Sequence, residues 1–269
     1  LFHYATYDAS FRHIYSAFLF SYLLNIAAQS KDGASKTIDL KIFAYGILSM
    51  LLILTRQTNL ILILSASLIL ACNHSFSFMQ KKNYAIFSII FTCIGIAFYL
   101  VYNFYHLGTV SLSTYGQESV IPFAQHTLQV FASYERGLFT YYPIFLIAVA
   151  IGWIAPKARL IYFISLLLII IYGLIYGSWS SWPLGAGFGH RGFVDMAPII
   201  MLTLGLSFQA TITSKFKNFF APLIITLSIA SIYVTVTTQH AYWRSNYTFS
   251  GATEGLYWNT LLQAPRNAD

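Results

Sequence analysis

The stretch from Gly177 to Pro198 holds the residue types best suited to binding chemistry in this chain. It contains two tryptophans, five glycines, a histidine, an arginine and an aspartate, and it lies between two very apolar segments. Glycine lets a backbone approach a ligand or a neighbouring helix closely, and tryptophan favours the membrane–water boundary. Arg191 and Asp195 lie four residues apart and share a face if a helix has begun there. Two interpretations follow: a ligand site, or an interfacial loop with an aromatic belt and a local ion pair.

No other motif in the sequence competes with this stretch. It has no nucleotide-binding glycine loop after a strand, no zinc spacing of the His-x-Glu type, and no serine–histidine–aspartate set that spacing can identify. Asp8 and His13 lie five residues apart, which is a poor spacing for two metal ligands on one helix face. Cys72 and Cys93 form neither a disulfide framework nor a metal motif. No apolar segment carries an acid near its middle, which argues against an ion-coupled carrier.

The composition predicts an all-α, polytopic integral membrane protein. The chain of 269 residues is 57% hydrophobic and 18% aromatic but only 9% charged. A soluble domain carries roughly a quarter charged residues. The formal net charge of +7 is scattered between apolar segments, so it favours a role in membrane orientation over nucleic-acid binding.

Eight apolar segments are candidates for membrane-crossing helices, which need about 17–25 residues each. They run near Ile14–Ala28, Leu40–Leu54, Leu60–Cys72, Tyr84–Phe104, Leu138–Ile154, Leu160–Tyr176, Met196–Phe208 and Phe219–Val236. We interpret residues 1–269 as a single transmembrane domain. Because the sequence starts at a leucine and shows no signal peptide, we expect it to be the middle and C-terminal part of a longer protein.

The lysines predict the orientation of these segments. All eight fall in alternate connections, namely those after the first, third, fifth and seventh segments. They are Lys31, Lys36, Lys41, Lys81, Lys82, Lys157, Lys215 and Lys217. Because lysine and arginine collect on the cytoplasmic side, these connections face the cytoplasm. The Gly177–Pro198 stretch and the long Tyr105–Glu135 loop then lie on the extracytoplasmic side.

That outer side carries no lysine but six of the seven arginines. They are Arg12, Arg56, Arg136, Arg191, Arg244 and Arg266. Arginine recognises phosphate and carboxylate groups with two parallel hydrogen bonds, so the set favours a shared site for an anionic group. Any single arginine is explained as well by a helix cap or by a nearby acid, as in the sequence neighbours Glu135–Arg136 and in Arg191–Asp195.

Four segments on this outer side resemble, in order, elements of the bacterial polytopic glycosyltransferases with the GT-C fold. Trp179-Ser-Ser-Trp182-Pro-Leu-Gly-Ala-Gly-Phe-Gly-His-Arg191, followed by Pro198, is similar to a loop of that family, with His190 where proline is usual. Ser133-Tyr-Glu-Arg136-Gly-Leu-Phe-Thr-Tyr-Tyr-Pro143 looks like an Arg-Gly-Leu element. Leu54-Thr-Arg56-Gln-Thr-Asn59 is similar to an Arg-Pro-Thr-Asn turn, and the segment Asp8–Ser16 resembles the entry to a middle span.

The resemblance implies transfer of a sugar from a polyprenyl-phosphate carrier to a glycan, lipid or protein acceptor on the outer face of the inner membrane. Positive charge must then meet the phosphate leaving group. The residues implied for the donor phosphate are, in order of preference, Arg191, Arg56 and Arg136. Those implied for the sugar or acceptor cavity are Trp179, Trp182 and His190, with Asp8, Glu118 and Asp195 as polar or metal contacts. The resemblance implies no particular cofactor, and a divalent metal is a possible one.

One departure from the family pattern concerns the catalytic carboxylate. Family members carry it in a long outer loop after their first span, and nothing here matches that arrangement. We therefore expect the base to lie upstream of Leu1 or to be lost, with Asp8 as the candidate within this chain. The alternative is a non-catalytic envelope component, such as a flippase, a polymerase-type protein or an assembly subunit. In that case the loop with Glu118 and His126 is a docking surface.

Overall fold

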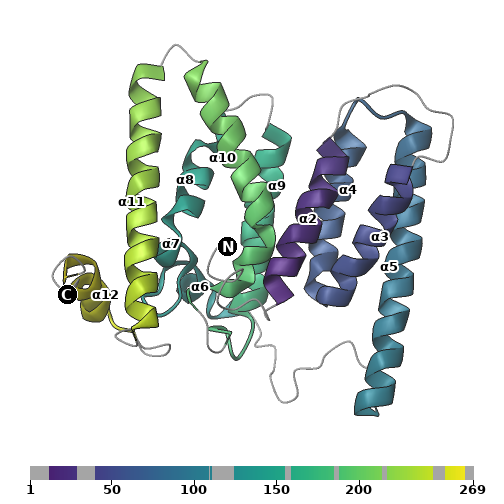
Figure 1. Ribbon diagram of the computed structural model, residues 1–269, viewed down its shortest axis with the longest axis horizontal. Helices are drawn as coiled ribbons and strands as arrows, with labels where there is room; N and C mark the ends of the chain where they lie inside the picture. The colour runs from purple at the N-terminus through teal and green to yellow at the C-terminus, as the bar shows by residue number, and fades with distance from the viewer. Residues whose placement is uncertain are drawn as a thin grey trace. The chain divides into compact units, whose positions relative to one another are not determined.

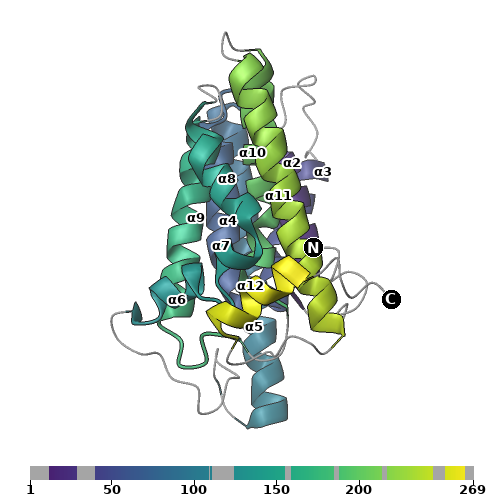
Figure 2. The ribbon, with the colours of Figure 1, turned by 90° about the vertical axis from the view of Figure 1, so that its left-hand side faces the viewer.

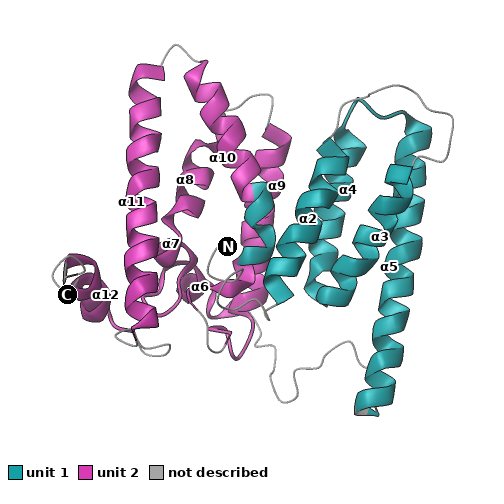
Figure 3. Cartoon of the chain, viewed as in Figure 1, with its two compact units in different colours: residues 1–117, 194–199 teal, residues 118–193, 200–269 magenta. Residues whose placement is uncertain are grey.

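The computed structural model describes residues 12–28, 40–108, 110, 124–154, 159–184, 188–213, 217–244 and 252–263. The regular elements in these residues are helices and none is a strand, so the predicted all-α class is confirmed for them (Figure 1). The chain divides into two compact units (Figure 3). Unit 1 comprises Leu1–Gln117 and Val194–Ile199, and unit 2 comprises Glu118–Phe193 and Ile200–Asp269.

Unit 1 contains four helices that run up and down beside one another. They are α2 (Arg12–Ala28), α3 (Leu40–Thr55), α4 (Leu60–Cys72) and α5 (Phe78–Leu107), with the short helix η1 (Gln57–Asn59) between α3 and α4. Helix α5 begins with a capping box, in which Ser77 and Gln80 each satisfy a backbone amide of the other. In the middle of the unit, Ser49 on α3 and Ser88 on α5 share a buried hydrogen bond of 3.0 Å.

Lysines and arginines occupy opposite ends of unit 1. Asn73, just after α4, donates to the carbonyl of Ala27 at the end of α2. Lys81 reaches the carbonyl of Ala71 at the same end. The other end of α2 contains Arg12 and His13, and Arg56 in the turn after α3 contacts His13 there. The alternation predicted from the sequence is thus present in the described helices of this unit.

Unit 2 contains the remaining helices. They are α6 (Thr127–Ala132), α7 (Leu138–Tyr141), α8 (Pro143–Ile151), η3 (Gly152–Ile154), α9 (Arg159–Gly177), α11 (Lys217–Trp243) and α12 (Glu254–Gln263). The elements η5 (Arg191–Met196) and α10 (Ala197–Ile212) each contribute residues to both units. Helix α12 is seen end-on in Figure 1 and from the side in Figure 2, so it lies across α11.

The eight predicted apolar segments all fall on helices, but only four described helices are long and apolar enough to cross a membrane. They are Phe78–His106, Arg159–Gly177, Arg191–Ile212 and Lys217–Trp243. Helices α3 and α4 have 16 and 13 residues. The predicted fifth segment, Leu138–Ile154, is divided into α7, α8 and η3. Its break lies at Tyr142–Pro143, because proline has no amide hydrogen and restricts the residue before it.

Candidate functional site

Three side chains from distant parts of the sequence meet at the arginine end of unit 1. Asp195 Oδ2 lies 2.8 Å from Arg56 Nη1, and Asp195 Oδ1 lies 3.0 Å from His13 Nδ1. Asp195 is fully buried, while His13 and Arg56 are 6% and 9% exposed. We call these three residues the carboxylate cluster. A buried carboxylate is stable only when it is paired, so both basic partners belong to the fold as well as to any site.

The protons of the carboxylate cluster have one arrangement that satisfies every contact of Asp195. His13 Nδ1 also lies 2.8 Å from Arg56 Nη1. A ring nitrogen either carries a hydrogen or accepts one, so the two contacts of Nδ1 exclude each other. With the hydrogen on Nδ1, His13 and Arg56 each donate to one oxygen of Asp195. Charge-assisted bonds of this kind are the stronger ones, which favours this arrangement.

An amide and two hydroxyls hold the helices beneath the carboxylate cluster. Asn59 Nδ2 donates to Ser16 Oγ at 2.7 Å and to Thr55 Oγ1 at 2.9 Å. It also bonds the carbonyl of Leu52. Arg56 itself has an extended backbone (φ −161°, ψ 138°) between α3 and η1. This turn breaks the helix at Thr55 and is locked to α2 through Ser16, so the position of Arg56 against His13 is fixed by a hydrogen-bond network.

In unit 2, four backbone carbonyls of the Gly177–Pro198 stretch accept hydrogen bonds from side chains. Arg136 Nη1 donates to the carbonyl of Pro183 at 2.9 Å, and Tyr142 donates to that of Phe188 at 3.0 Å. His190 Nε2 lies 3.1 Å from the carbonyl of Trp182 and therefore carries the hydrogen there. Tyr176 donates to the carbonyl of Gly192. We call the segment Trp182–Gly192 the carbonyl loop. Two of its anchors come from the Ser133–Pro143 segment that shares the family resemblance.

The structure separates the predicted site residues by exposure. His190 is fully buried between the rings of Tyr176 and Phe193. Its ring therefore packs inside the loop and is not accessible to solvent. Arg136 is 3% exposed, whereas Arg191 is only half-buried.

The tryptophans and the remaining predicted contacts differ in what the structure shows of them. Trp179 and Trp182 are half-buried, and Trp182 stacks on His126 with ring centroids 6.1 Å apart. Asp8 and Glu118 lie outside the described residues. Within the described ranges, no three His, Cys, Asp or Glu side chains gather as a metal site does.

The pairing of Asp195 with Arg56 and His13 is the feature that sequence reasoning missed. The spacing of Asp195 and Arg191 predicts an ion pair on one helix face, but the defined ion pairs of Asp195 go to residues 139 and 182 positions away. The hydrophobic periodicity of the sequence does not indicate which distant side chains meet in the fold. Helix α12 was missed too, although it has a sequence signal: the hydroxyl of Thr253 caps its first turn by accepting from Leu256.

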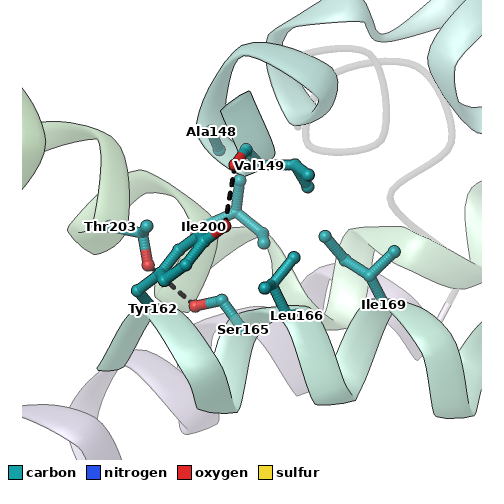
Figure 4. A pocket seen from close by; sticks show the side chains of 8 residues that line it. All are labelled: Ala148, Val149, Tyr162, Ser165, Leu166, Ile169, Ile200 and Thr203. Atoms are coloured by element: carbon teal, nitrogen blue, oxygen red, sulfur yellow. Dashed lines mark hydrogen bonds between the residues drawn. The ribbon is translucent and has the colours of Figure 1, made fainter. Parts of the chain in front are cut away.

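Two hollows in unit 2 differ in what they can hold. The first, between α8, α9 and α10, is bridged by Tyr162 to the carbonyl of Val149 and by Ser165 to Thr203, and it has no room for a water molecule (Figure 4). The second is a groove of about 300 Å³ between α8 and α11. Its lining is apolar except for Ser231. Of these two hollows, the groove is the one with room for a ligand, and its lining suits an apolar one.

Replacement of Gly177 by alanine is expected to destabilise unit 2 by about 1–3 kcal/mol, because a Cβ there would lie 2.7 Å from the Cα of Thr127. The two backbones are in contact at this point, since His126 donates to the carbonyl of Gly177. The measurement is the unfolding midpoint of the purified protein by circular dichroism. Gly205→Ala on α10 is the control, since its Cβ meets open space. Equal midpoints for the two variants would contradict the close contact.

The described residues therefore form two clusters, one in each unit. The carboxylate cluster joins α2 and the turn after α3 to Asp195, and the carbonyl loop is anchored on Arg136, Tyr142 and Tyr176. Comparison with known proteins adds no family to this description, because no family model, no curated protein and no solved structure gives a significant match to the chain.

Proposed function

We propose that this chain is the donor-binding part of a GT-C-type glycosyltransferase of the inner membrane. It transfers a sugar from a polyprenyl-phosphate carrier to an acceptor on the extracytoplasmic face. One observation carries the proposal: segments that share the family resemblance, at residues 13 and 56, meet the end of the Gly177–Pro198 stretch in the carboxylate cluster.

The donor phosphate is assigned first to Arg191 because of its exposure. Arg56 and Arg136 are buried and bond Asp195 and Pro183. Arg191 is half-buried and directly follows the anchored residue His190. A cation next to an anchored residue can stabilise the negative charge that develops on a leaving phosphate.

The groove between α8 and α11 suits the hydrocarbon part of the same donor. It measures about 300 Å³, and leucine, isoleucine, valine, alanine and proline make up nearly all of its wall. A prenyl chain is apolar along its length, so an apolar groove of this kind can accommodate it without specific polar contacts. The groove thus supports a lipid-linked donor over a nucleotide-linked one.

The remaining parts of the proposal concern topology and the base. We propose that the four shorter apolar segments also cross the membrane, as short spans that the bilayer accommodates by local thinning. The carbonyl loop then faces the extracytoplasmic side, opposite the lysines. No described residue is assigned as the carboxylate that deprotonates the acceptor hydroxyl. Trp179 and Trp182 contact the sugar or the acceptor from the rim of the loop.

The test is transfer by the full-length protein reconstituted in liposomes. A radiolabelled sugar is offered either on a polyprenyl phosphate or on a nucleotide, together with a crude envelope acceptor fraction. We expect label to reach the acceptor only from the lipid-linked donor. Transfer from the nucleotide sugar alone would reject the donor assignment, and no transfer from either donor by protein of verified fold would reject the enzymatic proposal.

One observation favours the alternative, a non-catalytic envelope subunit. Arg56, Arg136 and Asp195 are all buried and hydrogen-bonded, as expected of side chains that only stabilise a helical scaffold. Such a subunit would fail in the transfer assay yet copurify with an envelope assembly. Substitutions of these buried residues would then change the yield of the assembly. They would not change the rate of any sugar-transfer reaction.

A further inference from the structure

A tryptophan of the carbonyl loop stacks on a histidine from another segment of unit 2. The ring centroids of Trp182 and His126 are 6.1 Å apart, and the ring planes are inclined by 22°. His126 Nδ1 lies 3.1 Å from Oε1 of Gln129, which belongs to α6. Gln129 is exposed and both rings are half-buried, so all three side chains reach the surface of the unit. We call these three residues the stacked triad.

Backbone contacts hold the two segments of the stacked triad in place. The amide of His126 donates to the carbonyl of Gly177 at 2.9 Å, which ties the start of α6 to the end of α9 (Figure 2). The carbonyl of Trp182 accepts from the buried ring of His190, and the next carbonyl accepts from Arg136. Both rings of the triad therefore start from anchored backbone, as expected of a preorganised site.

The contact between His126 and Gln129 leaves one donor and one acceptor for a ligand. Because Gln129 Oε1 only accepts, Nδ1 carries the hydrogen of the neutral ring and Nε2 is an acceptor. The amide nitrogen of Gln129 is a donor that this contact does not use. Exchange of the amide oxygen and nitrogen reverses both roles and still gives one donor beside one acceptor.

A donor beside an acceptor selects the chemical class of the ligand. An ionised phosphate oxygen only accepts hydrogen bonds, and a metal ion binds only lone pairs, so each suits half of the pair. A hydroxyl donates and accepts, so two neighbouring hydroxyls of a sugar ring suit both halves at once. The aromatic rings offer an apolar surface to the C–H face of the same sugar. We propose that the stacked triad binds a neutral sugar through two adjacent hydroxyls.

The stacked triad adds hydroxyl recognition to the proposed transferase. His126 and Gln129 contact the hydroxyls, while Trp182 packs on the ring of the sugar. The inference rests on the proposed function for the choice of a sugar over another neutral polar ligand. Its test measures binding without transfer, so the two can fail separately. A protein that transfers sugar but does not bind at the triad would retain the transferase and remove this site.

The test follows the signal of Trp182 in the full chain while sugars are added. The protein is labelled with fluorinated tryptophan and placed in lipid nanodiscs, because glycoside detergents carry a competing sugar. The chain has five tryptophans, and the fluorine NMR signal of Trp182 is identified by its loss in Trp182→Phe. The probes are the methyl glycosides of glucose, galactose and mannose. Methoxytetrahydropyran, which has the ring without free hydroxyls, and N-acetylglycinamide, a neutral peptide analogue, are the comparison ligands.

We expect at least one glycoside to shift the Trp182 signal saturably, and neither comparison ligand to do so. His126→Phe retains a stacked ring and Gln129→Leu retains volume, but each removes one hydrogen-bond partner. Each is therefore expected to weaken binding about three- to tenfold. Gln209→Leu on α10 is the matched control, since it removes an exposed glutamine outside the triad, and it should bind as the parent does.

Three results would overturn the proposal. The first is the absence of a saturable shift with every glycoside. The second is equal affinity for either comparison ligand, which would show stacking alone or a peptide site. The third is unchanged affinity in both His126→Phe and Gln129→Leu, with the helicity of the parent protein retained.

Discussion

Replacement of Asp195 by alanine is expected to destabilise unit 1 by about 3–5 kcal/mol. Asp195 is fully buried and accepts from both Arg56 and His13. Without the carboxylate, the guanidinium of Arg56 stays buried with no counter-charge, and arginine cannot release its proton to escape this. The loss is therefore much larger than for an exposed acid. The measurement is the denaturant dependence of unfolding, followed by circular dichroism in one detergent.

Two variants separate the ion pair from other effects of the substitution. The double variant Arg56→Met/Asp195→Leu removes both charges and keeps apolar volume, so it is expected to recover most of the stability lost in Asp195→Ala. Glu254→Ala is the matched control for a removed acid, because Glu254 is exposed and bonds only Tyr134 among the contacts defined here. Its expected cost is below about 1 kcal/mol. A double variant no more stable than the single one would show that the ion pair is not the cause.

Replacement of Arg191 by alanine is expected to lower sugar transfer roughly 100- to 1000-fold, which is the usual effect of removing one preorganised group that stabilises a developing negative charge. This prediction rests on the proposed function. The residue directly follows His190, whose ring is held on the carbonyl of Trp182, so Arg191 starts from a fixed point in the loop. Initial rates of transfer from the lipid-linked donor are the measurement.

Charge and geometry are separated by two further arginine variants. Arg191→Lys keeps the charge but loses the planar fork, so an intermediate rate is expected. Arg159→Ala is the control at the other end of α9, where the side chain is exposed, and its rate should equal that of the parent protein. If Arg191→Ala turns over like the parent, with protein level and helicity intact, the phosphate assignment is wrong.

The sequence predicted the helical segments well because each is defined by a local property. Helix α4 has the bounds expected from its apolar run, Leu60–Cys72, and α3 ends one residue later than predicted. The lysines marked one end of unit 1 in the same local way. The number of spans was harder to predict, since hydropathy does not register the break that Pro143 makes or the shortness of α3.

The partners within each cluster were decided by tertiary structure alone. Composition, periodicity and the distribution of lysine determined that this is an all-α chain with apolar helices and arginine-rich helix ends, because those features depend on neighbours three or four residues away. That Asp195 pairs with Arg56 and His13, and that Arg136 holds Pro183, depends on which helix ends meet after packing. The Gly177–Pro198 stretch accordingly divides in two, with a loop tied by its carbonyls in unit 2 and a carboxylate that pairs with Arg56 within unit 1.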